Sequence, residues 1–167
     1  MEAANRGAFD AGGRTIGFNI GLPHEQRPNP YITPELSFEF HYFFMRKLWF
    51  AHLARVLVVF PGGFGTLDEL FEMVTLQQTG KLDRRIPILL YGSSYWKEII
   101  DFEALVRHGT IAREDLELLH FVDDPRSALA LLRSELEPHG AVPGADPGAD
   151  RGAKATPEFA PSRTPER

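Results

Sequence analysis

One continuous apolar run, followed at once by glycines, constrains the fold of this chain more than any other feature. Residues 56–60, Val-Leu-Val-Val-Phe, carry no polar side chain, which is typical of a parallel strand that is buried on both faces. Residues 61–65, Pro-Gly-Gly-Phe-Gly, interrupt the strand, and a helical pattern follows over residues 66–79. A buried strand, a glycine loop and a helix in that order predict an α/β protein.

The rest of the chain repeats this alternation of strands and helices. The other strands are predicted at residues 15–20, 86–91 and 119–122, and the other helices at residues 1–11, 35–55, 95–107 and 125–136. Strands separated by helices imply right-handed crossovers and a Rossmann-like, doubly wound parallel sheet. The chain opens inside a helix, where such folds usually open with a strand. The N-terminal edge of the sheet is therefore expected to be exposed or missing.

The last 30 residues differ in composition from the rest of the chain. Residues 138–167 contain six Pro, four Gly and six Ala, and Val142 and Phe159 are the only large apolar residues among them. Such a segment cannot bury enough apolar surface to offset the entropy of ordering it. We therefore expect a Rossmann-like domain over residues 1–137 and a disordered tail over residues 138–167.

Charge and cysteine content exclude several classes of protein. With 18 basic and 23 acidic residues the formal net charge is −5, which disfavours a protein that binds nucleic acid by neutralising phosphates. The absence of cysteine excludes a disulfide scaffold, a thiolate nucleophile and a Cys-ligated metal. The most apolar stretch, residues 48–60, is too short to span a bilayer, and the first six residues do not resemble a secretory signal. A cytoplasmic location is expected.

The glycine loop carries the candidate binding chemistry. Gly62, Gly63 and Gly65 allow the backbone to approach a ligand, and the following helix offers free N–H groups to an anion. In an open α/β sheet this loop lies at the carboxyl end of a strand, where ligands bind. The loop has neither the Gly-Lys-Ser/Thr of a P-loop nor the full dinucleotide fingerprint. Two interpretations stay open, a phosphate site and a tight turn capped by Thr66 and Glu69.

Charged residues accompany this loop in sequence. Asp68, Glu69 and Glu72 lie within about one helical turn, where a carboxylate could stabilise an oxocarbenium-like centre, orient a water or hold a ribose hydroxyl. The alternative is that Asp68 and Glu72 face solvent or the helix dipole. Arg46 and Lys47 are adjacent cations in an apolar helix and need partners. Those partners are either surface carboxylates or a phosphate or purine.

Taken together, these motifs resemble the LOG (Lonely Guy) family. Residues 61–69 match its Pro-Gly-Gly-x-Gly-Thr-x-x-Glu signature, and residues 45–47 match its Arg-Lys helix motif. Residues 22–26 and 77–81 are similar to the larger bacterial branch of the family. The resemblance covers residues 1–136.

The resemblance implies a Rossmann-like, usually dimeric enzyme that hydrolyses the N-glycosidic bond of a nucleoside 5′-monophosphate. The substrate would be AMP or an N6-modified cytokinin ribotide, and the products a free base and ribose 5-phosphate. Arg46 and Glu69 are implied as the catalytic pair. No cofactor and no metal ion are expected. The residues expected to bind the substrate and its phosphate are Lys47, Gly62, Gly63, Gly65 and Thr66.

Two further expectations concern activity. Many family members carry a lysine decarboxylase label, but none of the four lysines here lies in a motif for a pyridoxal Schiff base, so that activity is not expected. The resemblance implies that the family's first strand, helix and glycine-rich loop precede the position of Met1, so either the true protein starts earlier or this chain is a natural truncation, in which case its activity is in doubt. The alternative reading is therefore a non-catalytic nucleotide-binding module or an inactive truncated paralogue, and a carrier or interaction protein on the same scaffold is a third hypothesis.

Overall fold

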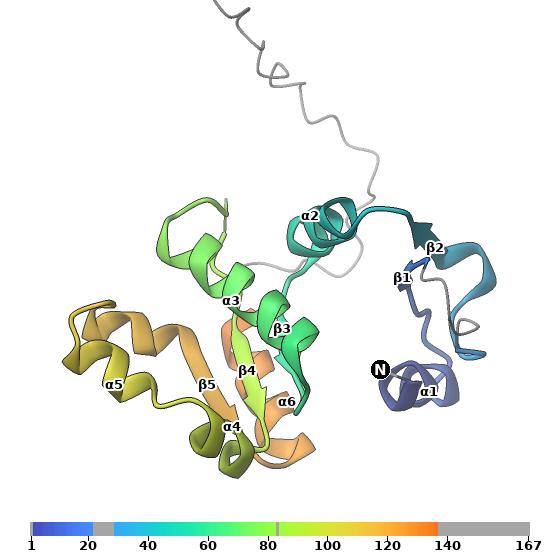
Figure 1. The fold of residues 1–167 in the computed structure, drawn as a ribbon. Coiled ribbons are helices and arrows are strands. Elements are labelled where there is room, and N and C mark those ends of the chain that lie inside the picture. Colours follow the sequence, from blue (N-terminus) through green and yellow to red (C-terminus); the bar gives the residue numbers. More distant parts are fainter. Residues whose placement is uncertain (1, 22–28, 83, 137–167) are drawn as a thin grey trace, which may run out of the picture.

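The computed structural model describes residues 2–21, 29–82 and 84–136 (Figure 1). The motif at residues 22–26 and the tail predicted at residues 138–167 lie outside the described residues. Strands and helices alternate along most of the described chain. The strands are β1 (Gly17–Ile20), β2 (Ser37–Phe40), β3 (Leu57–Val59), β4 (Ile88–Tyr91) and β5 (Leu119–Val122). The helices are α1 (Glu2–Asp10), η1 (Pro34–Leu36), α2 (Phe43–Leu53), α3 (Phe64–Gln78), α4 (Ser93–Ile99), α5 (Phe102–Arg107), η2 (Arg113–Leu118) and α6 (Pro125–Leu136).

The strands form two parallel sheets, and the α/β, Rossmann-like prediction is confirmed. β1 pairs with β2, and β3, β4 and β5 pair in that order. In the second sheet Val59 lies opposite Leu90, and Leu90 lies opposite Phe121. The prediction of four strands in one sheet is wrong, because β1 pairs with an additional strand rather than with β3. Among the described residues, the outer strands β1, β2, β3 and β5 each have one unpaired edge.

The additional strand, β2, replaces the first part of the helix predicted over residues 35–55. The sequence Ser37-Phe38-Glu39-Phe40 alternates with the period of a strand, and each residue pairs with one residue of β1. The ring of Phe18 meets the rings of Phe38 and Phe40 edge to face, at centroid distances of 5.9 and 5.4 Å. These cross-strand aromatic contacts stabilise the strand, and the helix begins only at Phe43.

Two helices, α4 and α5, replace the single helix predicted over residues 95–107. α4 ends at Ile99, and the side chain of Asp101 accepts a hydrogen bond of 2.9 Å from the N–H of Ala104. Asp101 is thus the N-cap of a new helix, and Arg107 in its last turn donates to the same carboxylate at 2.8 Å. The other predicted elements are confirmed, with bounds that differ by a few residues.

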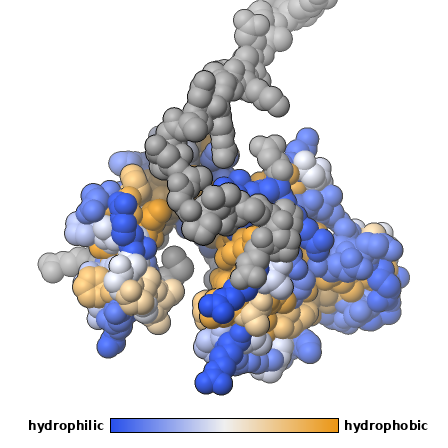
Figure 2. Space-filling view, turned by 180° about the vertical axis from the view of Figure 1, so that it is seen from behind, coloured by the Kyte–Doolittle hydropathy of each residue, from blue (hydrophilic) through white to orange (hydrophobic). Residues whose placement is uncertain are grey.

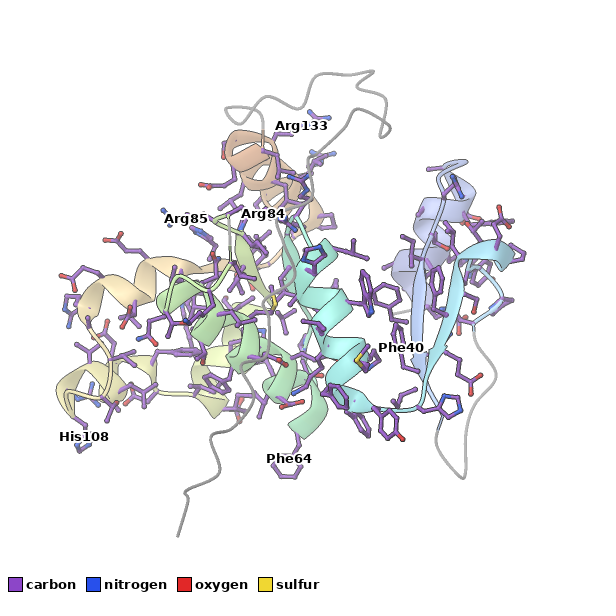
Figure 3. The ribbon with its side chains drawn as sticks, turned by 90° about the horizontal axis from the view of Figure 1, so that it is seen from above. Phe40, Phe64, Arg84, Arg85, His108 and Arg133 are labelled. Carbon is purple, nitrogen blue, oxygen red and sulfur yellow. The ribbon has the colours of Figure 1, made fainter. Side chains whose placement is uncertain are left out.

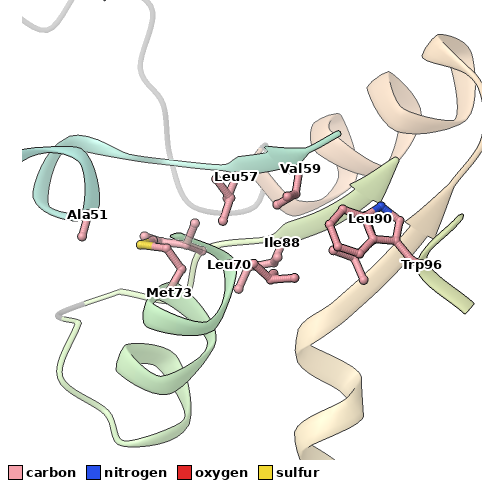
Figure 4. Packing of buried hydrophobic residues seen from close by; sticks show 9 residues of the cluster. Ala51, Leu57, Val59, Leu70, Met73, Ile88, Leu90 and Trp96 are labelled. Carbon is pink, nitrogen blue, oxygen red and sulfur yellow. The ribbon is translucent and has the colours of Figure 1, made fainter. Parts of the chain in front are cut away.

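The main hydrophobic core lies between the β3–β4 pair and helices α3 and α4 (Figure 4). Leu70, Met73, Ile88, Leu90 and Trp96 are each at most 1% exposed. The indole of Trp96 is anchored by a 2.9 Å hydrogen bond to the carbonyl of residue 91. A smaller cluster on the other face of the sheet is formed by Leu89, Val122 and Ala128. Burial on both faces explains why the sequences of β3 and β4 are almost wholly apolar.

Candidate active site

The glycine loop joins the end of β3 to the start of α3, as predicted, but the helix begins earlier than the sequence indicated. Gly63 is the N-cap, and its carbonyl accepts hydrogen bonds from the N–H groups of Thr66 and Leu67 at 3.0 and 3.1 Å. The alternative in which Thr66 and Glu69 cap the helix is therefore wrong. Thr66 instead lies over Gly62, where an added Cβ would be 2.2 Å from the Thr66 hydroxyl. Glycine is required at residue 62 by this close approach.

The start of α3 offers backbone donors to a ligand. Among the described residues, the N–H groups of Gly63, Phe64 and Gly65 form no hydrogen bond. The first N–H groups of a helix have no partner within the helix, and the dipole of this 15-residue helix makes its N-terminus attractive to an anion. The side chain of Phe64 is 93% exposed and points away from the helix (Figure 3). The loop therefore leaves its donors accessible.

Arg46 and Glu69 meet across the contact between α2 and α3. A guanidinium N–H of Arg46 donates to the Glu69 carboxylate at 2.5 Å. The two side chains are 17% and 29% exposed, so the pair is largely withdrawn from water. The Nε–H of Arg46 is buried and has no hydrogen-bond partner among the described residues. A buried donor of this kind is costly to leave unpaired, which favours an acceptor supplied by a ligand.

Lys47 has a different environment from its neighbour Arg46. Its ammonium group lies 3.1 Å from a carboxylate oxygen of Asp68 and 3.0 Å from one of Glu72. Hydrogen bonds to Glu72 and Asp68 raise the pKa of Lys47 above its ordinary value. Asp68 and Glu72 thus pair with a cation, although the Asp68 side chain is still 55% exposed, so the solvent-facing alternative for Asp68 stays open. Both cations of the Arg-Lys motif find carboxylate partners on α3.

These residues line two separate cavities. A cavity of about 590 Å³ is bordered by Phe18 of the first sheet, by β3, by Arg46 of α2 and by Thr66 and Glu69 of α3. This volume lies within the range of about 300–1,000 Å³ typical of small-molecule sites. Seen from behind, hydrophobic residues border a hollow between the N-terminal part and the rest of the molecule (Figure 2). Lys47 lines a neighbouring cavity of about 480 Å³ with Asp68 and Glu72.

The structure thus brings together most of the predicted site residues. Arg46, Glu69 and Thr66 line the larger cavity. Pro61, the residue directly before the glycines of the loop, lines it too. Lys47 does not open into that cavity in the described structure. One contact was missed by the sequence reasoning: the Tyr95 hydroxyl donates a 2.7 Å hydrogen bond to the carbonyl of Gly62. No motif marks Tyr95, but parallel pairing of β3 with β4 brings the segments after both strands to one edge.

The described residues contain neither a cluster suited to a metal ion nor a helix that could span a membrane. No group of three or more His, Asp or Glu side chains there is placed to hold a metal ion. No helix in the described ranges is long and apolar enough to cross a membrane.

Comparison with known proteins identifies relatives of this chain. Residues 1–132 match the model of the family described as "Possible lysine decarboxylase". The chain is also similar to the cytokinin riboside 5′-monophosphate phosphoribohydrolase of Rhodococcoides fascians. The two sequences are 27% identical over 138 residues, which cover 80% of this chain and 68% of that protein.

Proposed function

Because this chain belongs to the LOG family, we propose that it hydrolyses the N-glycosidic bond of a nucleoside 5′-monophosphate. Water adds across the bond between C1′ of the ribose and the base, and the products are the free base and ribose 5-phosphate. AMP and N6-modified cytokinin ribotides are the proposed substrates, and the similarity to the cytokinin riboside 5′-monophosphate phosphoribohydrolase of Rhodococcoides fascians supports the second. Lysine decarboxylation is not proposed, because none of the four lysines lies in a motif for a pyridoxal Schiff base.

The observation that carries this proposal is the Arg46–Glu69 pair beside the glycine loop. Loss of the base generates positive charge on the ribose, and the Glu69 carboxylate is the proposed stabiliser of that oxocarbenium-like centre. The unpaired Nε–H of Arg46 is the proposed donor to an acceptor atom of the substrate. The 2.5 Å contact between the two side chains fixes the carboxylate before substrate arrives, so little reorganisation accompanies the reaction.

The loop is the proposed site of the 5′-phosphate. The donors there would be the N–H groups of Gly63 and Gly65 and the hydroxyl of Thr66, with Gly62 allowing the backbone to approach closely. Phosphate binding by Lys47 stays a prediction, since its ammonium already contacts Asp68 and Glu72. A Lys47→Ala variant would test that role through the KM of a phosphorylated substrate.

A homodimer is also proposed, supported by the exposed aromatic surface of α2. Five large side chains at its start and along one side are between 44% and 65% exposed, which is unusual for a surface in permanent contact with water. They are Tyr42, Phe43, Phe44, Leu48 and Trp49. The mass measured by light scattering after size-exclusion chromatography tests this proposal. A mass of one chain at all accessible concentrations would contradict it.

The activity itself is tested by incubating the purified protein with AMP and with isopentenyladenosine monophosphate. Free base and ribose 5-phosphate are quantified by chromatography. We expect base release by the wild type and by Glu98→Ala, an exposed control on α4, and loss of release by Glu69→Ala. Nucleotide binding without release would favour the non-catalytic module instead. Absence of both binding and release would favour a carrier or interaction role.

A further inference from the structure

The peptide unit between Gly62 and Gly63 is the most adaptable part of the loop. Glycine lacks a side chain, so a peptide flanked by two glycines can rotate between orientations at low energetic cost. A trans peptide is planar, and its C=O and N–H groups point in opposite directions. Rotation of this unit would therefore exchange a donor for an acceptor on the side where a phosphate binds. An anion site that uses this peptide therefore needs a contact that holds the peptide in the orientation with its N–H toward the anion.

Tyr95 provides a contact that can make this selection. Its hydroxyl donates to the carbonyl of Gly62 at 2.7 Å, and the contact is partly buried. With that carbonyl held by Tyr95, the N–H of Gly63 in the same peptide unit points the opposite way. This N–H group forms no hydrogen bond to any described residue. It is thus left available for a ligand on the side away from Tyr95.

The fold places Tyr95 firmly enough for this role. Gly92 follows β4 in the left-handed region, with φ of +84°, and its N–H donates to the carbonyl of Val122 at 2.8 Å. The carbonyl of Gly92 accepts from the N–H of Tyr95 at 3.1 Å, so the first turn of α4 starts directly beside the loop. The ring of Tyr95 packs edge to face on that of the fully buried Trp96, with centroids 5.2 Å apart. Both ends of the Tyr95 side chain are therefore fixed.

We propose that Tyr95 is a positioning residue, which holds the Gly62–Gly63 peptide so that the N–H of Gly63 faces the 5′-phosphate. This inference rests on the proposed function only for the identity of the ligand. Tyr95 touches neither the base nor the reacting bond in this scheme. Removal of the Tyr95 hydroxyl should therefore weaken binding of the phosphate group and leave binding of the rest of the substrate unchanged.

The test compares Tyr95→Phe with Tyr91→Phe. The first change removes the hydroxyl and keeps the ring that packs on Trp96, so the fold is expected to be retained. The control removes the hydroxyl of another half-buried tyrosine, which contacts the ring of Phe60 and forms no hydrogen bond through its hydroxyl among the described residues. The measured quantities are the Kd values for ribose 5-phosphate and adenosine, and kcat and KM for AMP. Melting temperatures report whether each variant is folded.

For Tyr95→Phe we expect the Kd of ribose 5-phosphate and the KM of AMP to rise about 2- to 13-fold, the effect of losing one hydrogen bond. The kcat for AMP and the Kd of adenosine should change by less than about twofold, and the control should resemble the wild type. Equal weakening of adenosine and ribose 5-phosphate would indicate a general structural role and overturn the inference. Unchanged binding of ribose 5-phosphate would overturn it too.

These outcomes separate the inference from the proposed function. A wild type that binds ribose 5-phosphate but releases no base would refute the hydrolase, while the Tyr95→Phe comparison would still measure the positioning role. A wild type that releases base, with Tyr95→Phe showing an unchanged KM, would refute only the role of Tyr95. A wild type that binds no ribose 5-phosphate would refute the positioning role as well.

Discussion

Replacing either member of the Arg46–Glu69 pair should cost stability as well as activity, and the two costs can be separated. In Glu69→Ala the Arg46 guanidinium keeps its place between α2 and α3, where its side chain is only 17% exposed, but loses its carboxylate partner. Its Nε–H already has no partner among the described residues, so a second donor of the same group becomes unpaired. The perturbation therefore creates an uncompensated charge in a largely buried position.

The expected loss of folding free energy in Glu69→Ala follows from the burial of the pair. Leaving a buried polar group unsatisfied costs about 1–3 kcal/mol, and breaking a fully buried ion pair costs about 3–5 kcal/mol. Because both side chains retain some contact with water, we expect the lower range, about 1–3 kcal/mol, for Glu69→Ala. In the double variant Arg46→Ala/Glu69→Ala neither charge is left alone. Its destabilisation should be smaller than the sum of the single changes by about 1–3 kcal/mol.

The assay is a double-mutant cycle on the free energy of unfolding, measured by urea denaturation of the four proteins. Base release is measured in parallel. We expect the double variant to be more stable than additivity predicts, because it leaves no unpaired charge. We expect it to remain inactive, because it lacks the Glu69 carboxylate. Additive single effects, within about 0.5 kcal/mol, would refute the coupling inferred from the 2.5 Å contact.

Further predictions concern the loop, the neighbouring ion pairs and the core. Gly62→Ala should abolish phosphate binding, measured by calorimetry, since its Cβ would lie 2.2 Å from the Thr66 hydroxyl; Gly7→Ala in α1, with open space around it, is the control. Because the pKa of Lys47 is raised by Glu72 and Asp68, its stabilisation should persist at neutral pH and disappear as the pH rises through that raised value, above about 10.5. Comparing unfolding midpoints of wild type and Lys47→Met at alkaline pH checks this. Leu70→Ala should lower the free energy of unfolding by about 2–5 kcal/mol, measured by denaturation, because Leu70 is 0% exposed.

The sequence predicted those parts of the fold in which local pattern and tertiary environment agree. β3 and β4 are almost wholly apolar because helices cover both faces of their sheet, and such a run is recognisable without a structure. β2 was missed because it precedes an aromatic helix without an intervening glycine, and its four-residue alternation is stabilised by pairing with β1. That pairing joins residues 20 apart, and a local pattern does not report it.

For the candidate site, residue types were easier to predict than partners. Two cations in an apolar helix need carboxylates or a ligand, and acidic residues on the next helix were the natural candidates. Which cation meets which acid depends on the rotation of α2 and α3 about their axes, which places Glu69 on Arg46 and Asp68 on Lys47. The Tyr95 contact depends on strand order, since α4 follows the strand that neighbours β3.

In the part of the chain that the structure describes, β1 and β3 each have an unpaired edge, and this has a consequence for the behaviour of the protein at high concentration. An open edge is a template for an added strand, and natural proteins usually protect such edges with lysine, proline or a bulge. Leu57, Val58 and Val59 of β3 provide none of these, and β1 has no lysine or proline. Intermolecular strand pairing at these edges is therefore the expected route to aggregation.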